Sequence, residues 1–195
     1  MAERQSGLTL NDIRADHKER YNFAIKQFLD CNLTGRVLDA GCGVGYGSYM
    51  MSEYINHIHS VELSQEAYTN YKQFFYKPNI HFTQNDIFKA QLMDRYDAVV
   101  CFEFLEHIQD AAEAIKLFAQ VSNVLISSTP NEKVRPWAKE PINYYHVRHY
   151  TPEQYEQMLI DAGYTNNTFF YQKSGSQPNI LPGTNGKFMI AFSMK

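Results

Sequence analysis

The chain contains 195 residues, a length typical of one domain with a sizeable hydrophobic core. Its formal net charge of −3 provides no global electrostatic attraction to a phosphate backbone. The three cysteines show no Cys-x-x-Cys spacing, which argues against a disulfide framework and against a zinc ribbon. No apolar run reaches the length of a membrane span, and the N-terminus lacks the apolar stretch of a signal peptide. We therefore expect a single-domain cytoplasmic protein without a membrane span.

Helical and strand patterns alternate along the chain, as in proteins whose mostly parallel sheet is covered by helices on both faces. Within residues 1–33, apolar residues recur at spacings of three and four, which predicts an N-terminal helix. Thr151, Pro152 and Gln154 form the pattern of a capped helix start. Seven strands are expected, at residues 37–38, 57–62, the apolar run before Asn85, and 96–102, 124–126, 168–172 and 188–193. The last two should form an antiparallel hairpin through residues 182–186.

An acid and alternating glycines follow the first predicted strand, at Asp39, Gly41, Gly43 and Gly45. A glycine lacks the Cβ that would obstruct a sharp turn and the approach of a ligand to the backbone amides, which we expect to face that ligand at a helix N-terminus. Asp39 lies where its carboxylate would repel a pyrophosphate but hold a cationic amino-acid head group. S-adenosylmethionine (SAM) has such a head group.

Glu62 ends the second predicted strand, where its carboxylate can accept hydrogen bonds from both ribose hydroxyls. A dinucleotide site would use the same acid, but the glycines here follow Gly-x-Gly-x-Gly and not Gly-x-Gly-x-x-Gly. Asp86 follows the third apolar run. In this pattern the chain resembles the class I SAM-dependent methyltransferases, whose first motif is an acid, one residue and Gly-x-Gly-x-Gly. The resemblance covers most of the chain.

This resemblance implies an α/β fold with a Rossmann-like, seven-stranded, mostly parallel sheet, helices on both faces and an antiparallel last strand. It implies one methyltransferase domain over residues 1–195, with the N-terminal helix covering the cofactor site. Asp86 is similar to the acid that contacts adenine in that family, and Tyr21 would close over the cofactor. The residues expected to contact SAM are Tyr21, Asp39, Gly41, Cys42, Gly43, Gly45, Glu62, Leu63, Asp86, Ile87 and Glu103.

Two carboxylates and an imidazole follow the fourth predicted strand, at Glu103, Glu106 and His107. One helical turn there would place all three on one face. Such a set can ligate a divalent cation, or it can act as a base with its orienting group. The alternative is a solvated acidic turn whose His107 satisfies a backbone carbonyl, and this segment alone leaves the alternatives open.

Residues 129–150 show no clear periodicity, and a connection of this length in a compact domain is typical of a lid or a binding loop. The segment mixes aromatic side chains, among them Trp137 and Tyr144, with cationic ones such as Lys139 and Arg148. We expect it to become ordered over the acceptor when ligands bind. The alternative is a surface insertion, for which so many exposed aromatic residues would be unusual.

Glu-x-x-Glu-His, followed by Thr-Pro-Asn and then two histidines three residues apart, is similar to two groups of methyltransferases. One group comprises the ubiquinone-biosynthesis O-methyltransferases and related enzymes acting on sugars and other small acceptors. The other comprises the small-RNA 3′-terminal 2′-O-methyltransferases. The second group implies Mg, Mn or Zn held by Glu103, Glu106, His107 and His146, while His149 stands where that group has an acid.

We therefore expect methyl transfer from SAM to an acceptor oxygen of a small molecule or glycan, with His107, Glu106 and His146 as catalytic residues. A cation would lower the pKa of the acceptor hydroxyl. Without one, His107 would be the general base. Two alternatives stay open: a metal-dependent RNA 3′-terminal 2′-O-methyltransferase, which the low basic content disfavours, and a SAM-binding protein without catalysis. DNA methylation is disfavoured because the Asn-Pro-Pro-Tyr, Asp-Pro-Pro-Tyr and Pro-Cys motifs are missing from the sequence.

Overall fold

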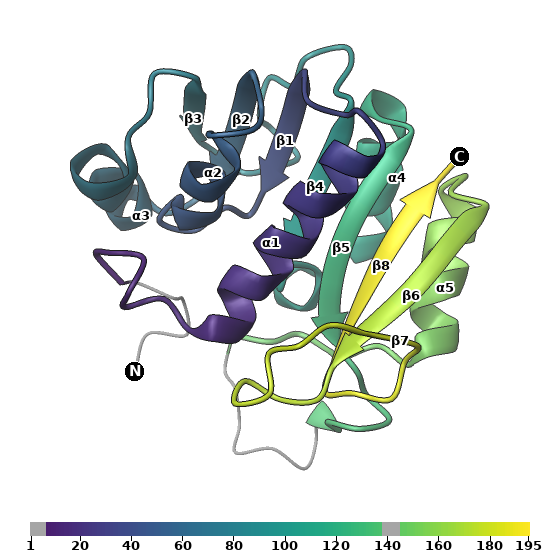
Figure 1. Cartoon of the computed structure of the whole chain (residues 1–195). Helices are drawn as coiled ribbons and strands as arrows, with labels where there is room; N and C mark the ends of the chain where they lie inside the picture. Colours follow the sequence, from purple (N-terminus) through teal and green to yellow (C-terminus); the bar gives the residue numbers. More distant parts are fainter. Residues whose placement is uncertain (1–6, 138–144) are drawn as a thin grey trace.

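The computed structural model describes residues 7–137 and 145–195, which form an eight-stranded sheet with helices on both faces (Figure 1). The strand order is β3-β2-β1-β4-β5-β8-β6-β7. Five neighbouring strands are parallel: β3 (Ile80–Gln84), β2 (His57–Glu62), β1 (Arg36–Ala40), β4 (Ala98–Phe102) and β5 (Val124–Pro130). The other three run antiparallel to their neighbours: β8 (Phe188–Met194), β6 (Asn166–Gln172) and β7 (Leu181–Pro182).

The predicted α/β architecture with a mostly parallel sheet and an antiparallel last strand is confirmed, but the predicted count of seven strands was wrong. The additional strand, β7, consists of two residues that pair with Phe170 and Tyr171 of β6. Two residues carry no periodicity that a sequence could reveal. The pairing of β6 with β8 is antiparallel, as predicted.

Helices cover the two faces of the sheet with separate buried clusters. One face carries α1 (Ala15–Asp30), α2 (Tyr46–Met51), α3 (Gln65–Asn70) and the π-helix η1 (Tyr71–Phe75), and the other carries α4 (Ala111–Val121) and α5 (Pro152–Asp161) (Figure 1). A short 3-10 helix, η2 (Leu105–His107), follows β4. No helix within the described ranges has both the length and the apolar character needed to cross a bilayer.

The start of α5 has the predicted capping box. The Thr151 hydroxyl accepts a hydrogen bond from the Gln154 amide at 3.3 Å, and the Gln154 side chain accepts one from the Thr151 amide at 3.0 Å. This reciprocal pair satisfies two backbone donors that a helix start leaves without partners. It therefore fixes where α5 begins and positions the preceding residues 145–150, which include His146 and His149.

Parallel pairing brings the carboxyl ends of β1, β2, β4 and β5 to one edge of the sheet. Asp39 of β1 lies opposite Ser60 of β2, and Phe102 of β4 lies opposite Ser128 of β5. Open α/β sheets bind their ligands outside these strand ends. The residues predicted to form the site follow these strands, so the topology gathers them from distant parts of the sequence.

Candidate functional site

The loop after β1 turns through three glycines in the left-handed region, with φ of 72° at Gly41, 55° at Gly43 and 83° at Gly45. A Cβ on Gly41 would lie 2.4 Å from the ring of Phe104, so that position is closed by packing. A Cβ on Gly43 would meet no protein atom within 4 Å. The backbone at Gly43 therefore borders open space, and a ligand could approach it there.

Three amides of this loop donate to acceptors at the end of β2, and the prediction that amides of the loop face a ligand stays a prediction. Those of Gly41 and Cys42 donate to the carbonyl of Val61 at 2.9 and 3.2 Å, and that of Gly43 donates to the Glu62 carboxylate at 3.3 Å. The sequence does not indicate these acceptors, because they belong to the neighbouring strand β2. The loop is thus fixed to the end of β2, and Glu62 is held beside Gly43.

Asp39 is fully buried below the loop and accepts two hydrogen bonds, from the Tyr21 hydroxyl at 3.1 Å and from the Ser48 hydroxyl at 2.5 Å. Burial raises the pKa of Asp39 to about 6, although the hydrogen bonds from Ser48 and Tyr21 oppose this shift. Tyr21 was expected to close over the cofactor. Tyr21 is buried with its ring against Gly47, and its hydroxyl orients the Asp39 carboxylate, so its contact with a cofactor stays a prediction.

Four further predicted cofactor residues lie at the ends of β2 and β3, namely Glu62, Leu63, Asp86 and Ile87. The Glu62 carboxylate also accepts a hydrogen bond from the Ser64 amide at 3.0 Å, while the side chain of Leu63 is 65% exposed. After β3, Asp86 is half-buried and Ile87 is buried. An exposed apolar side chain beside acids at adjacent strand ends suits a nucleoside, and their contact with a cofactor stays a prediction.

Glu103 lies between β4 and η2 and is one of two described non-glycine residues with a positive φ, here 49°. Its amide donates to Ser128, and its carboxylate accepts a hydrogen bond of 2.7 Å from the Ser128 hydroxyl. The predicted helical turn was wrong in its start, because the 3-10 turn spans Leu105–His107 and leaves Glu103 outside. Glu103 therefore faces β5 and is not grouped with the other predicted metal ligands.

Glu106, His107 and His146 converge, and one candidate ligand atom from each lies within 4.8 Å of the others. The rings of His107 and His146 meet edge to face, with centroids 4.7 Å apart. Nδ1 of His107 lies 3.0 Å from the carbonyl oxygen of Tyr145, and the Val147 amide donates to the Glu106 carbonyl at 2.7 Å. Three of the four predicted metal ligands are thus brought together by two segments that are about forty residues apart in the chain.

Glu106 is a buried carboxylate that lacks a hydrogen-bond partner for one of its oxygens among the described residues. The residue is fully buried, and this oxygen is Oε1. Burial, followed by the negative charge of Glu103, raises the pKa of Glu106 well above its ordinary value. A cation at this point would supply the missing partner, because a buried carboxylate is stable in its charged form only when it is paired. The donor set of one carboxylate and two imidazoles suits Mn or Zn and admits Mg.

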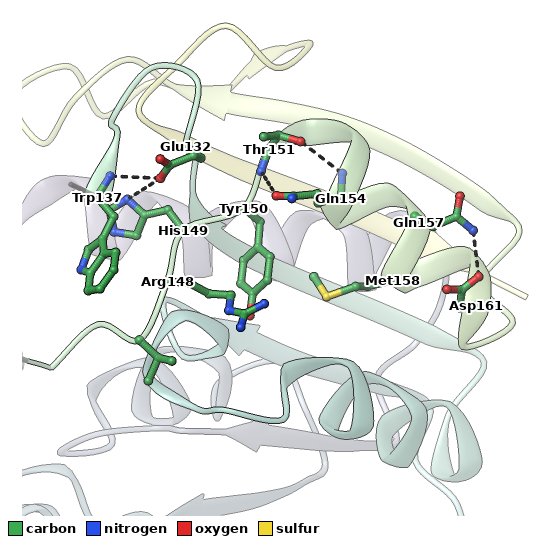
Figure 2. Close-up of a pocket in the computed structure, with 11 residues that line it drawn as sticks. Glu132, Trp137, Arg148, His149, Tyr150, Thr151, Gln154, Gln157, Met158 and Asp161 are labelled. Atoms are coloured by element: carbon green, nitrogen blue, oxygen red, sulfur yellow. Dashed lines mark hydrogen bonds and ion pairs between the residues drawn. The ribbon is translucent and has the colours of Figure 1, made fainter. Parts of the chain in front are cut away.

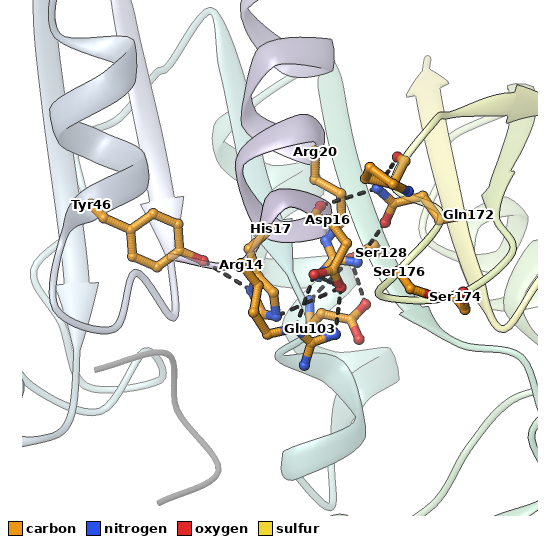
Figure 3. Close-up of polar contacts among 11 residues, drawn as sticks. Arg14, Asp16, His17, Arg20, Tyr46, Glu103, Ser128, Gln172, Ser174 and Ser176 are labelled. Carbon is orange, nitrogen blue, oxygen red and sulfur yellow. Dashed lines mark hydrogen bonds and ion pairs between the residues drawn. The ribbon is translucent and has the colours of Figure 1, made fainter. Parts of the chain in front are cut away.

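A buried polar network that sequence reasoning missed joins the start of α1 to β6 (Figure 3). Arg14 donates two hydrogen bonds to Asp16, at 3.0 and 2.8 Å, and Arg20 donates one of 2.7 Å to the side chain of Gln172. Asp16 and Arg20 are fully buried, as charged residues are only when they find partners. Charges on the apolar stripe of a helix are a signal in the sequence, but the partner Gln172 lies 152 residues away from Arg20.

His17 connects this network to the glycine loop. Its Nδ1 lies 3.1 Å from the hydroxyl of Tyr46, the first residue of α2. Burial, followed by the positive charges of Arg20 and Arg14, lowers the pKa of His17 to about 2. The ring is therefore neutral near pH 7, and Figure 3 shows it on the same side of α1 as Glu103.

A groove of about 700 Å³ opens between α5 and the segment that leads into it (Figure 2). Its lining includes Trp137, Arg148, His149, Gln157, Met158 and Asp161. His149 also contacts His146, with 2.7 Å between ring nitrogens, so a residue that lines the groove touches one of the three converging residues. The predicted lid, residues 129–150, contributes part of this lining. Residues 138–144, including Lys139 and Tyr144, lie outside the described residues, and the lid role stays a prediction.

Comparison with known proteins identifies the family to which this sequence and fold belong. A family model described as a methyltransferase domain matches residues 13–168. A protein of Mycobacterium tuberculosis named as a probable SAM-dependent methyltransferase is 32% identical over 133 residues, which cover 66% of this chain and 48% of the relative. A ubiquinone biosynthesis O-methyltransferase of Aromatoleum aromaticum is 33% identical over 90 residues, which cover 44% of this chain and 38% of the relative. The chain spans about half the length of the M. tuberculosis relative.

Solved structures match over nearly the whole chain. The methyltransferase domain of a bacterial Hen1 protein has a TM-score of 0.71 at 15% identity, and the match covers 92% of this chain and 98% of that one. Magnesium protoporphyrin IX methyltransferase of Synechocystis with bound SAM has a TM-score of 0.66 at 21% identity, covering 91% of this chain and 78% of that one. At these identities, the likeness establishes the fold.

Proposed function

The chain belongs to the methyltransferase-domain family, and we propose that it is a SAM-dependent enzyme that methylates a hydroxyl oxygen of a small-molecule or glycan acceptor. The observation that carries this proposal is the convergence of Glu106, His107 and His146 at the end of β4, beside the glycine loop of β1. A methyl donor held by the loop and a hydroxyl held by the cluster would meet at this edge of the sheet. SAM supplies an activated methyl group, so the protein has to align the acceptor and remove its proton.

The residues at the ends of β1 and β2 fit SAM. Asp39 provides a buried negative charge below the loop for the cationic head group, and Glu62 provides carboxylate oxygens for the ribose hydroxyls. The open space at Gly43 admits the ligand between them. Both acids are fixed by hydrogen bonds within the loop region, so binding requires little rearrangement of the Asp39 side chain.

We propose that Glu106, His107 and His146 hold a divalent cation. Such a cation lowers the pKa of an acceptor hydroxyl as a Lewis acid. The Oε1 of Glu106, which has no hydrogen-bond partner among the described residues, supports this assignment, since the positive charges of Arg20 and Arg135 only partly offset the cost of burying the carboxylate. Glu103 is assigned to the wall of the site, because its carboxylate is already oriented by Ser128. If no cation binds, His107 is the general base, with its Nδ1–H donated to the Tyr145 carbonyl and Nε2 as the accepting atom.

The groove along α5 supports a glycan-like or small polar acceptor over RNA. Trp137, 40% exposed, offers an aromatic face, and Gln157 offers an amide. Among the described residues of the lining, Glu132 and Asp161 contribute two carboxylates and Arg148 contributes one guanidinium. A phosphate backbone would be repelled by this balance, whereas neutral hydroxyls can bond to all of these groups.

Parallel incubations with labelled SAM test the acceptor class. Fractionated metabolites, neutral oligosaccharides and a short RNA with a free 3′-terminal ribose are supplied separately, and the label in each is counted. We expect incorporation into the metabolite or oligosaccharide fractions, as a methyl ether. Incorporation into RNA would instead establish the RNA-end activity if it is lost when the terminal ribose of the RNA is oxidised with periodate before the incubation, since this oxidation destroys the 2′,3′-diol that carries the acceptor hydroxyl. SAM binding with no turnover in any fraction would favour a protein that only binds SAM.

A further inference from the structure

Two histidines in the segment before α5 form a continuous hydrogen-bonded chain. Nδ1 of His149 lies 2.7 Å from the carbonyl oxygen of Arg135, and Nε2 of His149 lies 2.7 Å from Nδ1 of His146. Both rings are buried, at 5% and 8% exposure. The two rings are inclined by 63°, with centroids 5.0 Å apart. The chain therefore runs from a backbone carbonyl, through one imidazole, to a predicted metal ligand.

The direction of each hydrogen bond follows from the first atom of the chain. A carbonyl oxygen can only accept, so Nδ1 of His149 must carry the proton. The carboxylate of Glu132, which also can only accept, lies 3.8 Å from the same nitrogen and favours the same assignment. In a neutral imidazole Nε2 is then an acceptor, and the proton between the rings belongs to Nδ1 of His146. His146 consequently has its lone pair on Nε2.

His107 reaches the same state by a different route. Its Nδ1 faces the carbonyl oxygen of Tyr145 at 3.0 Å, so the proton lies on Nδ1 and the lone pair lies on Nε2. Both imidazoles of the cluster are thus prepared as Nε2 ligands. One is oriented directly by the backbone, and the other is oriented through His149.

We propose that His149 is a positioning residue that fixes the tautomer and the ring orientation of His146, so that His146 presents Nε2 to the cation beside Glu106 and His107. This inference rests on the proposed function, because it assumes that the cluster holds a cation. Outer-shell partners of metal-bound histidines commonly include carboxylates, and their removal weakens metal binding. A neutral imidazole does the same orienting without adding a second negative charge near Glu106, whose buried charge is already poorly compensated.

Three substitutions at His149 separate orientation from simple packing. His149→Gln keeps an oxygen that can accept from His146 and an N–H that can donate to Arg135, His149→Glu keeps the acceptor and adds a charge, and His149→Leu keeps neither hydrogen bond. The matched control is His59→Leu, which removes another buried histidine with two side-chain hydrogen bonds, to Tyr96 at 2.6 Å and Thr83 at 2.9 Å. His59 lies in the interior of β2, away from the cluster.

The first measurement is the binding of Co²⁺ alone, followed by calorimetry and by the visible absorption of the ion, with SAM affinity recorded in parallel. We expect His149→Leu to weaken Co²⁺ binding by about 10- to 100-fold. His149→Gln should stay within a few-fold of the unaltered protein, His149→Glu should bind at least as tightly, and His59→Leu should match the unaltered protein. SAM affinity should be unchanged in all four. Equal Co²⁺ affinity in His149→Leu and His149→Gln would overturn the proposal.

The second measurement needs no metal. Long-range ¹⁵N–¹H NMR spectra of the imidazoles at pH 8 report which nitrogen of His146 carries the proton. We expect Nδ1–H in the unaltered protein and in His149→Gln, and loss of this preference in His149→Leu. An Nε2–H tautomer in the unaltered protein would overturn the proposal even if no substitution at His149 gave a folded protein. If the protein bound no Co²⁺ but His146 showed the expected tautomer, the cation would be removed from the proposed function while the orienting role of His149 stood.

Discussion

Replacing Glu106 by Gln should stabilise the protein when no cation is present. The Glu106 side chain is fully buried, its Oε1 lacks a hydrogen-bond partner in the described parts of the chain, and its pKa is raised by burial and then by the charge of Glu103. A carboxyl whose pKa is higher in the folded state than in the unfolded state costs stability as the pH rises above its ordinary value of 4.5. A neutral amide of nearly the same shape removes this cost, so the gain should be larger at pH 8 than at pH 5.

An unsatisfied buried polar group costs about 1–3 kcal/mol and a charged one costs more, so removing the charge while keeping a polar amide should recover an energy of about this size. Each kcal/mol moves the midpoint of a chain of this size by roughly 2–4 °C. We therefore expect the melting temperature of metal-free Glu106→Gln to exceed that of the unaltered protein by about 2–12 °C at pH 8. With Mn²⁺ at 100 times its dissociation constant, the unaltered protein should gain about 2.7 kcal/mol, whereas the variant should gain almost nothing.

Thermal unfolding by circular dichroism, in chelator and in Mn²⁺, measures both effects on the same samples. Glu113→Gln on α4 is a suitable control, because Glu113 is exposed and its pairing with Lys116 is a surface contact of little energetic weight. The control should shift by less than about 0.5 kcal/mol under either condition. A metal-free Glu106→Gln that melts below the unaltered protein would refute the reasoning, since it would mean that the charged carboxylate is well compensated by the protein itself.

Four further outcomes follow from the site. Gly43→Val should abolish SAM binding. The control is Gly163→Val, where φ is 99° and a Cβ would also meet no atom within 4 Å, so it should bear a similar backbone strain and bind SAM normally. Calorimetry and thermal melts compare the two variants. Glu62→Ala should weaken SAM binding by about 1–3 kcal/mol in the same calorimeter, and an unchanged affinity would remove Glu62 from the site. SAM affinity should fall as the pH is lowered through about 6, where Asp39 gains a proton. Asp39→Asn should bind SAM weakly, with an affinity that changes less with pH. The same pH dependence of affinity in the variant and in the unaltered protein would contradict this role of Asp39. Trp137, the sole tryptophan, should change its fluorescence when SAM product and acceptor are added together, and constant emission would count against a lid in this segment.

The sequence predicted the features that are local to single strand ends. The chain must turn directly after β1, and alternating glycines predict such a turn. The positive φ angles at Gly41, Gly43 and Gly45 are the result. Asp39 and Glu62 could be placed because parallel strands carry their carboxyl ends to one edge. The acceptor of the Gly41 and Cys42 amides could not be predicted, because it is the Val61 carbonyl of a neighbouring strand.

The parts that the sequence did not predict depend on contacts between distant segments. Glu103 has a left-handed backbone that separates it from Glu106, a conformation that no pattern of residue types around it announces. His149 contacts His146 through one ring nitrogen and the carbonyl of the distant Arg135 through the other. The buried Arg20 on α1 likewise donates to Gln172 of β6, far away in the sequence. Local spacing suggested Glu103, Glu106 and His107 as ligands. Only the folded structure shows that Glu103 faces β5, whereas Glu106 and His107 converge with His146.

Methyl transfer from labelled SAM under single-turnover conditions, with the acceptor fraction identified above, tests the central assignment most directly. The unaltered protein is assayed after exhaustive chelation and after Mn²⁺ is restored, beside His107→Ala and His146→Ala in Mn²⁺. We predict that chelation and both substitutions lower the rate by at least about 100-fold while SAM binding persists, and that Mn²⁺ restores the rate of the unaltered protein alone. Full activity in chelator, with a loss only in His107→Ala, would contradict the cation and leave His107 as the general base, and full activity in both variants would place the chemistry elsewhere.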